Sequence, residues 1–162
     1  MTARSIVHDT FAIERTYPAT PSRVFAAFAS ADAKNIWADT GDIEAADGAA
    51  GASEFDFRPG GRERFGFKYS GKTYRYHAVY YDIVPDERIV YSYEMHEDGA
   101  RISVSVATIE FAKNGDGTAL TWTEQGAYLD GIDGPEAPAH RMEGTAEMLA
   151  GLTGYLASQA AH

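Results

Sequence analysis

The sequence predicts an α+β fold in which one curved antiparallel sheet of about seven strands surrounds a long C-terminal helix, with two short helices after the first strand. Two patterns predict it. Apolar and polar residues alternate over most of the chain between turn sequences, and the C-terminal segment carries one apolar stripe at helical spacing. Aromatic residues, which favour strands, make up 12% of the chain. With 162 residues in all, we expect one domain, residues 1–162.

The N-terminal part is predicted to be a strand followed by two short helices. Residues 5–17 alternate apolar and polar side chains, as a half-buried strand does. Thr20 then supplies a hydroxyl cap, and Pro21 suits the first position of a short helix. Asp32 is expected to cap the second short helix, which ends at Trp37.

Residues 54–128 are predicted to supply the remaining strands. Turn sequences rich in Gly, Pro, Asn and Asp separate them, at residues 58–61, 70–71, 85–86, 98–99 and 114–117. This regular spacing favours one strongly curved meander. Residues 39–53 are rich in Ala, Gly and Asp, and we expect a loop there at the rim of the sheet, which either orders over a pocket mouth or stays open.

The C-terminal segment is predicted to be one long helix. Its buried stripe is expected at Met142, Ala146, Leu149, Thr153 and Leu156, widened by Met148, Leu152 and Tyr155. Gly144 and Gly151 interrupt it, either because the helix packs closely on the sheet or because the missing side chains leave volume for a ligand. A curved sheet around one helix is hard to fill with side chains, so we expect an internal cavity.

Composition excludes several classes of function. The 24 acidic and 14 basic residues give a formal charge of −10, so we expect neither nucleic acid nor a membrane surface as partner. Cysteine is absent, which excludes disulfides, thiol nucleophiles and zinc–thiolate sites. No signal peptide or membrane span is visible, and we expect a cytoplasmic protein.

No metal or other cofactor is expected. His140 and Glu143 stand three residues apart on the predicted helix, but two ligands make a poor metal site and no motif supplies a third. Residues 130–136 resemble a calcium loop only faintly, and a flexible lid is the better interpretation. Phosphate-binding glycine loops, serine-hydrolase elbows and zinc-protease motifs are also missing from the sequence.

Five motifs together resemble those of one known family. They are YPATPSRVF at Tyr17–Phe25, FRPGGR at Phe57–Arg62, VPDERIVYSYE at Val84–Glu94, GTALTWT at Gly117–Thr123 and MEG at Met142–Gly144. In these motifs the chain is similar to the START-like (SRPBCC) superfamily. Within it, the chain resembles the bacterial homologues of the activator of the heat-shock-protein-90 ATPase, over nearly its whole length.

This resemblance implies the helix-grip fold but not one function. The superfamily includes lipid carriers, hormone receptors, polyketide cyclases, oxygenase subunits and co-chaperone domains, so the function must be argued from the site. The family usually has Trp where this chain has Tyr93 and Thr145. These two departures argue against copying a ligand preference from relatives.

We expect the ligand to lie between the inner face of the sheet and the last helix. The candidate ligand-binding residues are Trp37, Phe65, Phe67, Tyr76, Tyr80, Tyr91, Tyr93, Met95, Trp122, Glu124, Arg141, Met142, Met148 and Leu149. Phenol and indole rings combine apolar bulk with one hydrogen-bonding tip, which suits an amphipathic ligand. The alternative is that these rings only build the core.

Two charged candidates carry possible chemistry. Glu124 shares strand parity with Trp122, so it either points into the apolar pocket, as a general acid or base with a raised pKa, or ends its strand at the wet rim. Arg141, in the first turn of the last helix, either neutralises Glu124 or a ligand carboxylate, or is a solvated surface residue.

Three functions are consistent with these patterns. The first is binding of a small hydrophobic or amphipathic molecule in an internal cavity, without an established reaction. The second is a polyketide cyclase- or dehydratase-like enzyme that moves protons with Glu124 and the pocket tyrosines. The third is a co-chaperone-like interaction module. A homodimer through the outer sheet face is also possible, because Ile102, Val104 and Val106 are expected there.

Overall fold

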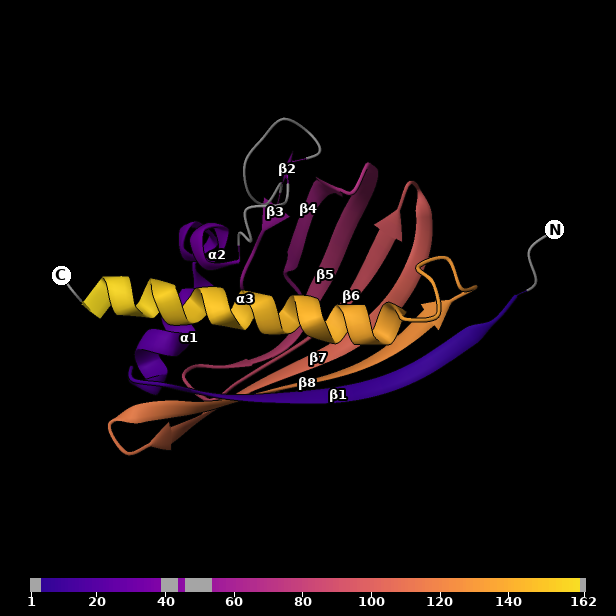
Figure 1. Cartoon of the computed structure of the whole chain (residues 1–162). Coiled ribbons are helices and arrows are strands. Elements are labelled where there is room, and N and C mark those ends of the chain that lie inside the picture. The colour runs from indigo at the N-terminus through magenta and orange to yellow at the C-terminus, as the bar shows by residue number, and fades with distance from the viewer. Residues whose placement is uncertain (1–3, 39–43, 46–53, 161–162) are drawn as a thin grey trace.

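The computed structural model of the protein describes residues 4–38, 44–45 and 54–160. One curved antiparallel sheet of eight strands wraps around a long C-terminal helix, and two short helices lie at one end of that helix (Figure 1). The predicted α+β class and helix-grip fold are therefore confirmed.

The sheet is a meander from β4 to β8, and the first strand adds to it at the edge beside β8. Its order is β1-β8-β7-β6-β5-β4-β2, and β3 pairs with β4. The strands are β1 (Ile6–Tyr17), β2 (Glu44–Ala45), β3 (Glu54–Phe55), β4 (Arg62–Tyr69), β5 (Lys72–Val84), β6 (Arg88–Glu97), β7 (Ala100–Asn114) and β8 (Gly117–Leu129). Residues 54–57, expected to contain a full strand, form only the two-residue β3. Most of the predicted loop 39–53 lies outside the described residues.

The two short helices are α1 (Pro21–Ala29) and α2 (Ala31–Trp37). Thr20 caps α1 as predicted, since its hydroxyl accepts a hydrogen bond from the Arg23 backbone N–H at 3.3 Å. The expected cap of α2 was wrong. Ser30 Oγ accepts from the Ala33 N–H at 3.2 Å, so the helix begins at Ala31, two residues earlier than expected, and Asp32 lies in its first turn.

The long helix α3 (Ala137–Ala160) packs against β1, β8 and α2. Beyond Ala137 at its start, its buried side chains are Thr145, Leu149, Leu152 and Leu156. Met142, expected on the buried stripe, is 45% exposed, and Thr153 is also exposed, so these two expectations were wrong. The last four buried positions are four, three and four residues apart, so they form one stripe that faces the sheet. Met142 lies to one side of this stripe.

The two helix glycines differ. A Cβ on Gly151 would lie 2.2 Å from the backbone oxygen of Trp37, so the absence of a side chain lets α3 approach the end of α2. Close packing therefore explains Gly151. A Cβ on Gly144 would meet no atom within 4 Å, so packing does not require glycine there.

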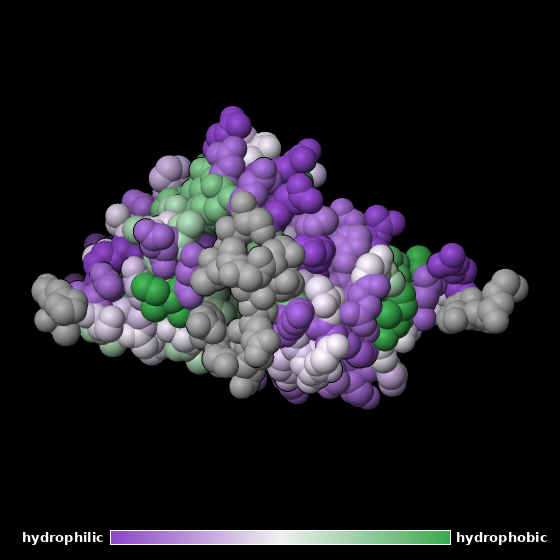
Figure 2. Space-filling model, turned by 90° about the horizontal axis from the view of Figure 1, so that it is seen from above, coloured by the Kyte–Doolittle hydropathy of each residue, from purple (hydrophilic) through white to green (hydrophobic). Residues whose placement is uncertain are grey.

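The outer face of the sheet is only partly as expected. Val104 and Val106 are exposed, at 40% and 41%, but Ile102 is buried. Met95 pairs with Ser103 and His96 with Arg101, so Ile102 is the extra residue of a β-bulge, which turns its side chain away from the outer face. Seen from above, the described surface is mainly hydrophilic, with a few hydrophobic patches (Figure 2). Among the described helices, none is long and apolar enough to cross a membrane.

Candidate functional site

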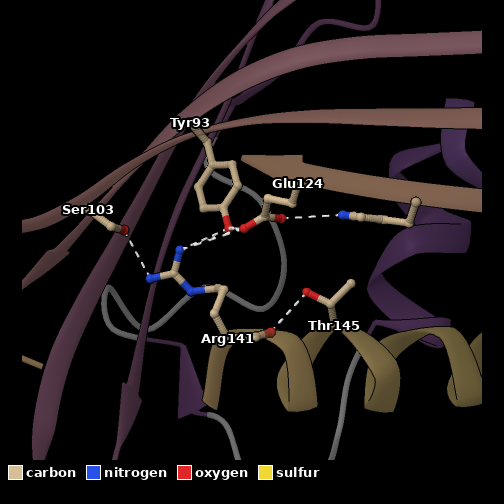
Figure 3. Close-up of polar contacts among 6 residues, drawn as sticks. Tyr93, Ser103, Glu124, Arg141 and Thr145 are labelled. Atoms are coloured by element: carbon tan, nitrogen blue, oxygen red, sulfur yellow. Dashed lines mark hydrogen bonds and ion pairs between the residues drawn. The ribbon is translucent and has the colours of Figure 1, made fainter. Parts of the chain in front are cut away.

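A buried polar cluster lies between the inner face of the sheet and the first turns of α3 (Figure 3). Strand parity places Tyr93 of β6 and Glu124 of β8 on this inner face. In the register, Glu124 pairs with Ala107 of β7, and Tyr93 pairs with Ser105 of β7. Because Ala107 and Ser105 are small, the Tyr93 ring reaches across β7 to Glu124.

Hydrogen bonds join five residues of this cluster. Tyr93 OH donates to Glu124 Oε2 at 2.6 Å, and Trp122 Nε1 donates to Glu124 Oε1 at 3.3 Å. Arg141 Nη1 donates to Tyr93 OH at 2.9 Å, and its Nη2 donates to Ser103 Oγ at 2.9 Å (Figure 3). Arg141 Nη1 lies 4.0 Å from Glu124 Oε2. The Tyr93 hydroxyl therefore stands between the two charged groups.

Burial controls the protonation of this cluster. Glu124 is 1% exposed, and burial raises its pKa against the opposing effects of Tyr93, Arg141 and Trp122. Burial also raises the pKa of Tyr93, so its hydroxyl remains protonated. Burial acts to lower the pKa of Arg141, but Tyr93, Tyr128 and Glu124 together raise it, and the guanidinium stays charged.

Aromatic rings hold Arg141 in place. Its guanidinium carbon lies 5.5 Å from the centre of the Tyr93 ring and 5.4 Å from that of the Tyr128 ring, within cation–π range. Thr145 Oγ1 donates to the Arg141 backbone oxygen at 3.1 Å, one turn along α3. The arginine is thus a positioned group with a side chain only 12% exposed, not a solvated surface residue.

A row of half-buried residues, four of them aromatic, leads from this cluster along the inner face of the sheet to β4. We call it the aromatic shelf, and it consists of Phe65, Phe67, Tyr74, Tyr76 and Met95. Phe67 stacks on Tyr74 with ring centres 5.2 Å apart, and Phe65 stacks on Tyr76 at 4.8 Å. Tyr76 lies 5.0 Å from Tyr93. β4, β5 and β6, which carry the shelf, curve up beyond α3 (Figure 1).

The structure divides the candidate residues into three groups. Tyr93, Trp122, Glu124 and Arg141 form the polar cluster, and Phe65, Phe67, Tyr76 and Met95 form most of the shelf. Trp37, Tyr80, Tyr91, Met148 and Leu149 belong to or pack on the apolar core. Trp37 Nε1 donates to the Ala27 backbone oxygen at 2.9 Å, and Tyr80 OH donates to Glu63 at 2.7 Å. Met142 belongs to none of the groups, because it is exposed.

Three residues of the site, Tyr74, Ser103 and Tyr128, are not among the candidates predicted from the sequence. Tyr74 has the strand parity of Tyr76, and Tyr128 has that of Glu124, so parity alone could have found both. Ser103 has the strand parity of Ala107 and Ile109 on β7, so parity could have found it as well, whereas the bulge changes only the orientation of Ile102.

Two hollows beside the described residues are lined by neither Glu124 nor the shelf. One, of about 20 Å³, lies between the loop before α3 and the residues Val7, Ile102 and Tyr128, and it has room for a water molecule. The other is an open groove beside Tyr17 and the β7–β8 turn. The expected internal cavity stays a prediction. Within the described part of the chain, no group of three or more His, Asp or Glu side chains could hold a metal ion.

Comparison with known proteins agrees with the fold. Residues 18–157 match the model of the family described as "Activator of Hsp90 ATPase homolog 1-like protein". Among solved structures, the Mll3558 protein of Rhizobium loti is 46% identical, with a TM-score of 0.80 over 93% of this chain and 99% of that one. An uncharacterized protein of Rhizobium leguminosarum is 39% identical, with a TM-score of 0.82 over 97% and 99%. No curated protein matches the chain.

Proposed function

The chain belongs to the family of Activator of Hsp90 ATPase homolog 1-like proteins, and since one fold serves many activities, we propose from the site itself that it binds a small amphipathic molecule. The apolar part of this molecule lies on the aromatic shelf, in a cavity between the shelf and α3. Its polar end reaches the cluster of Tyr93, Glu124 and Arg141.

The observation that carries this proposal is the continuity of the rings. Tyr76 touches Phe65 on one side and Tyr93 on the other, so an apolar surface leads directly to a buried polar end. Covering apolar surface stabilises a complex by about 25 cal/mol per Å². The half-buried shelf offers such surface, whereas the core rings, already covered, do not.

The polar cluster at the end of the shelf would orient the bound molecule. Its groups are buried and held by hydrogen bonds and ring contacts, so they are already arranged before a ligand arrives. A mostly apolar site with a few fixed polar groups is typical of small-molecule pockets.

The raised pKa of Glu124 favours a second candidate function, a cyclase- or dehydratase-like enzyme that uses it as a general acid or base. In this structure both oxygens of Glu124 are engaged, one by Tyr93 and one by Trp122. Tyr93 would therefore have to give way, or relay the proton itself. This candidate is contradicted if Glu124→Gln leaves the turnover of a substrate unchanged. A co-chaperone-like interaction stays a prediction as well.

Binding of 2-naphthol, a flat aromatic molecule with one hydroxyl, tests the proposed function. We expect Tyr76→Ala to weaken this binding at least about tenfold, because it removes the middle ring of the row. Tyr81→Ala is the matched control, since Tyr81 lies on the same strand but is 63% exposed. Phe67→Ala provides a second shelf variant nearer the end of the row. Titration followed by fluorescence measures each affinity, and absence of binding to the wild-type protein would overturn the proposal.

A further inference from the structure

We propose that the bound molecule is an amphipathic carboxylic acid, whose carboxylate is held by Arg141 while Glu124 takes up one proton from the solvent. This inference rests on the proposed function and names the chemical class of its ligand.

Arg141 has hydrogen-bond donors that its described neighbours do not use. A guanidinium has five N–H donors. Two hydrogen bonds go to the neutral hydroxyls of Tyr93 and Ser103, and three donors have no partner among the described residues. The side chain is only 12% exposed. A buried cation whose hydrogen bonds go to neutral groups retains the capacity to bind an anion.

Other cations near buried carboxylates are paired directly. Lys34 Nζ lies 2.7 Å from Glu63, and Lys72 Nζ lies 2.9 Å from Glu97. Arg141 instead stands 4.0 Å from Glu124, with the Tyr93 hydroxyl between them. The planar fork of arginine matches a carboxylate with two parallel hydrogen bonds. Arg141 also lies in the first turns of α3, where the helix dipole favours a negative ligand.

The charges of Arg141 and Glu124 determine what happens when a carboxylate binds. A ligand carboxylate on Arg141 places a second negative charge beside Glu124 in a water-poor site. Two carboxylates that share one cation do not both stay ionised at low cost, so one takes a proton. Glu124 is suited to do so, because burial already raises its pKa. Its uncharged carboxyl retains an oxygen that accepts the hydrogen bond from Tyr93.

Other ionisable groups face this pair from the surrounding elements. They are Tyr91 and Tyr93 of β6, Tyr128 of β8 and Asp133 of the loop before α3, with Asp9 of β1 near Tyr128, and with Glu97 of β6 and His140 of α3 near Asp133. Burial raises the pKa of all three tyrosines, so they stay neutral. Burial also raises the pKa of Asp133, which makes Asp133 the competing proton acceptor.

Two probes of equal size test the inference. They are 2-naphthoate and 2-naphthamide, which differ in charge but share the ring and the carbonyl. Calorimetric titration in phosphate and in Tris at pH 7 gives the affinities and the number of protons taken up. We expect the wild-type protein to prefer 2-naphthoate at least about tenfold and to take up close to one proton with it.

The variants assign the two roles. Arg141→Met should lose the preference for 2-naphthoate but still bind 2-naphthamide. Glu124→Gln should bind 2-naphthoate without proton uptake, whereas Asp133→Asn should still take up the proton. If Arg141→Met does not fold, Arg141→Lys replaces it, and we expect a preference reduced several-fold because the fork is lost.

Equal affinity of the wild-type protein for both probes, or no proton uptake with 2-naphthoate, overturns this inference and leaves the proposed function intact. Proton uptake lost in Asp133→Asn but kept in Glu124→Gln overturns the role of Glu124. If neither probe nor 2-naphthol binds, the proposed function itself is contradicted.

Discussion

The two ends of α3 hold buried polar groups in different ways. At the C-terminal end, which we call the packed end, Glu63 is paired directly with Lys34 at 2.7 Å and with Tyr80 at 2.7 Å. Gly151 lets α3 touch the end of α2 there. At the N-terminal end, which we call the polar end, Tyr93 links Glu124 to Arg141 by hydrogen bonds, and the two charged groups themselves are 4.0 Å apart.

We infer from this difference that the packed end mainly stabilises the fold and the polar end is available for a ligand. A direct ion pair satisfies both charges, so the packed end has little left to offer a ligand. The polar end keeps unused donors on Arg141, and Ser105 Oγ is buried there without a hydrogen-bond partner in the described part of the chain. Buried polar groups without partners are costly, and a ligand that pairs with them recovers that cost.

The largest expected effect concerns the glycine at the packed end. Gly151→Ala would place a Cβ against the Trp37 backbone oxygen, which cannot move without shifting α2. We expect a loss of about 3 kcal/mol in the free energy of unfolding, measured by urea denaturation. Gly144→Ala is the matched control on the same helix, and it should stabilise the protein by up to about 1 kcal/mol, since alanine favours helix. Equal effects at both positions would contradict the close approach at Gly151.

The next effect concerns the direct ion pair of the packed end. Lys34→Met leaves Glu63 buried with only Tyr80 as partner, and we expect a loss of about 2–3 kcal/mol, somewhat below the range for fully buried pairs because Lys34 is partly exposed. Lys34→Arg should recover most of this loss. A loss below about 0.5 kcal/mol would show that the packed end does not depend on the pair, and the contrast between the ends would fail.

The smallest effect is a dependence on pH at the polar end. Because the pKa of Glu124 is raised in the folded protein, its proton stabilises the fold at low pH, below the ordinary carboxyl value near 4.5. That contribution is lost as the pH rises through the folded pKa. The stability of the wild-type protein relative to Glu124→Gln should therefore fall as the pH rises from about 4.5.

A control of opposite sign is available for this measurement. A hydrogen bond from Arg101 lowers the pKa of Glu94, so the stability of the wild-type protein relative to Glu94→Gln should rise with pH below the ordinary carboxyl value near 4.5 and stay level above it. Urea denaturation at a series of pH values measures both differences. If both stability differences changed with pH in the same direction, the raised pKa of the buried Glu124 would be contradicted.

The sequence alone was sufficient for much of this protein. Alternation and turns indicated most strands, Thr20 and Pro21 indicated the start of α1, and the overall pattern indicated a curved sheet around a long helix, which the family resemblance identified as the helix-grip fold. Strand parity also pointed Glu124 inward beside Trp122. These features depend on local periodicity, which is present in the chain before it folds.

Only the tertiary structure decided how these elements meet. The bulge at Ile102 turned the side chain of that residue inward, and the rotation of α3 exposed Met142 while it brought Arg141 to Tyr93, 48 residues away in sequence. Bulges, helix rotation and the contact of Gly151 with α2 follow from packing between distant segments, and no local pattern encodes them. The sequence therefore offered a buried Glu124 as one of two alternatives, and the tertiary structure decided that it is buried and that its cation lies one hydroxyl away.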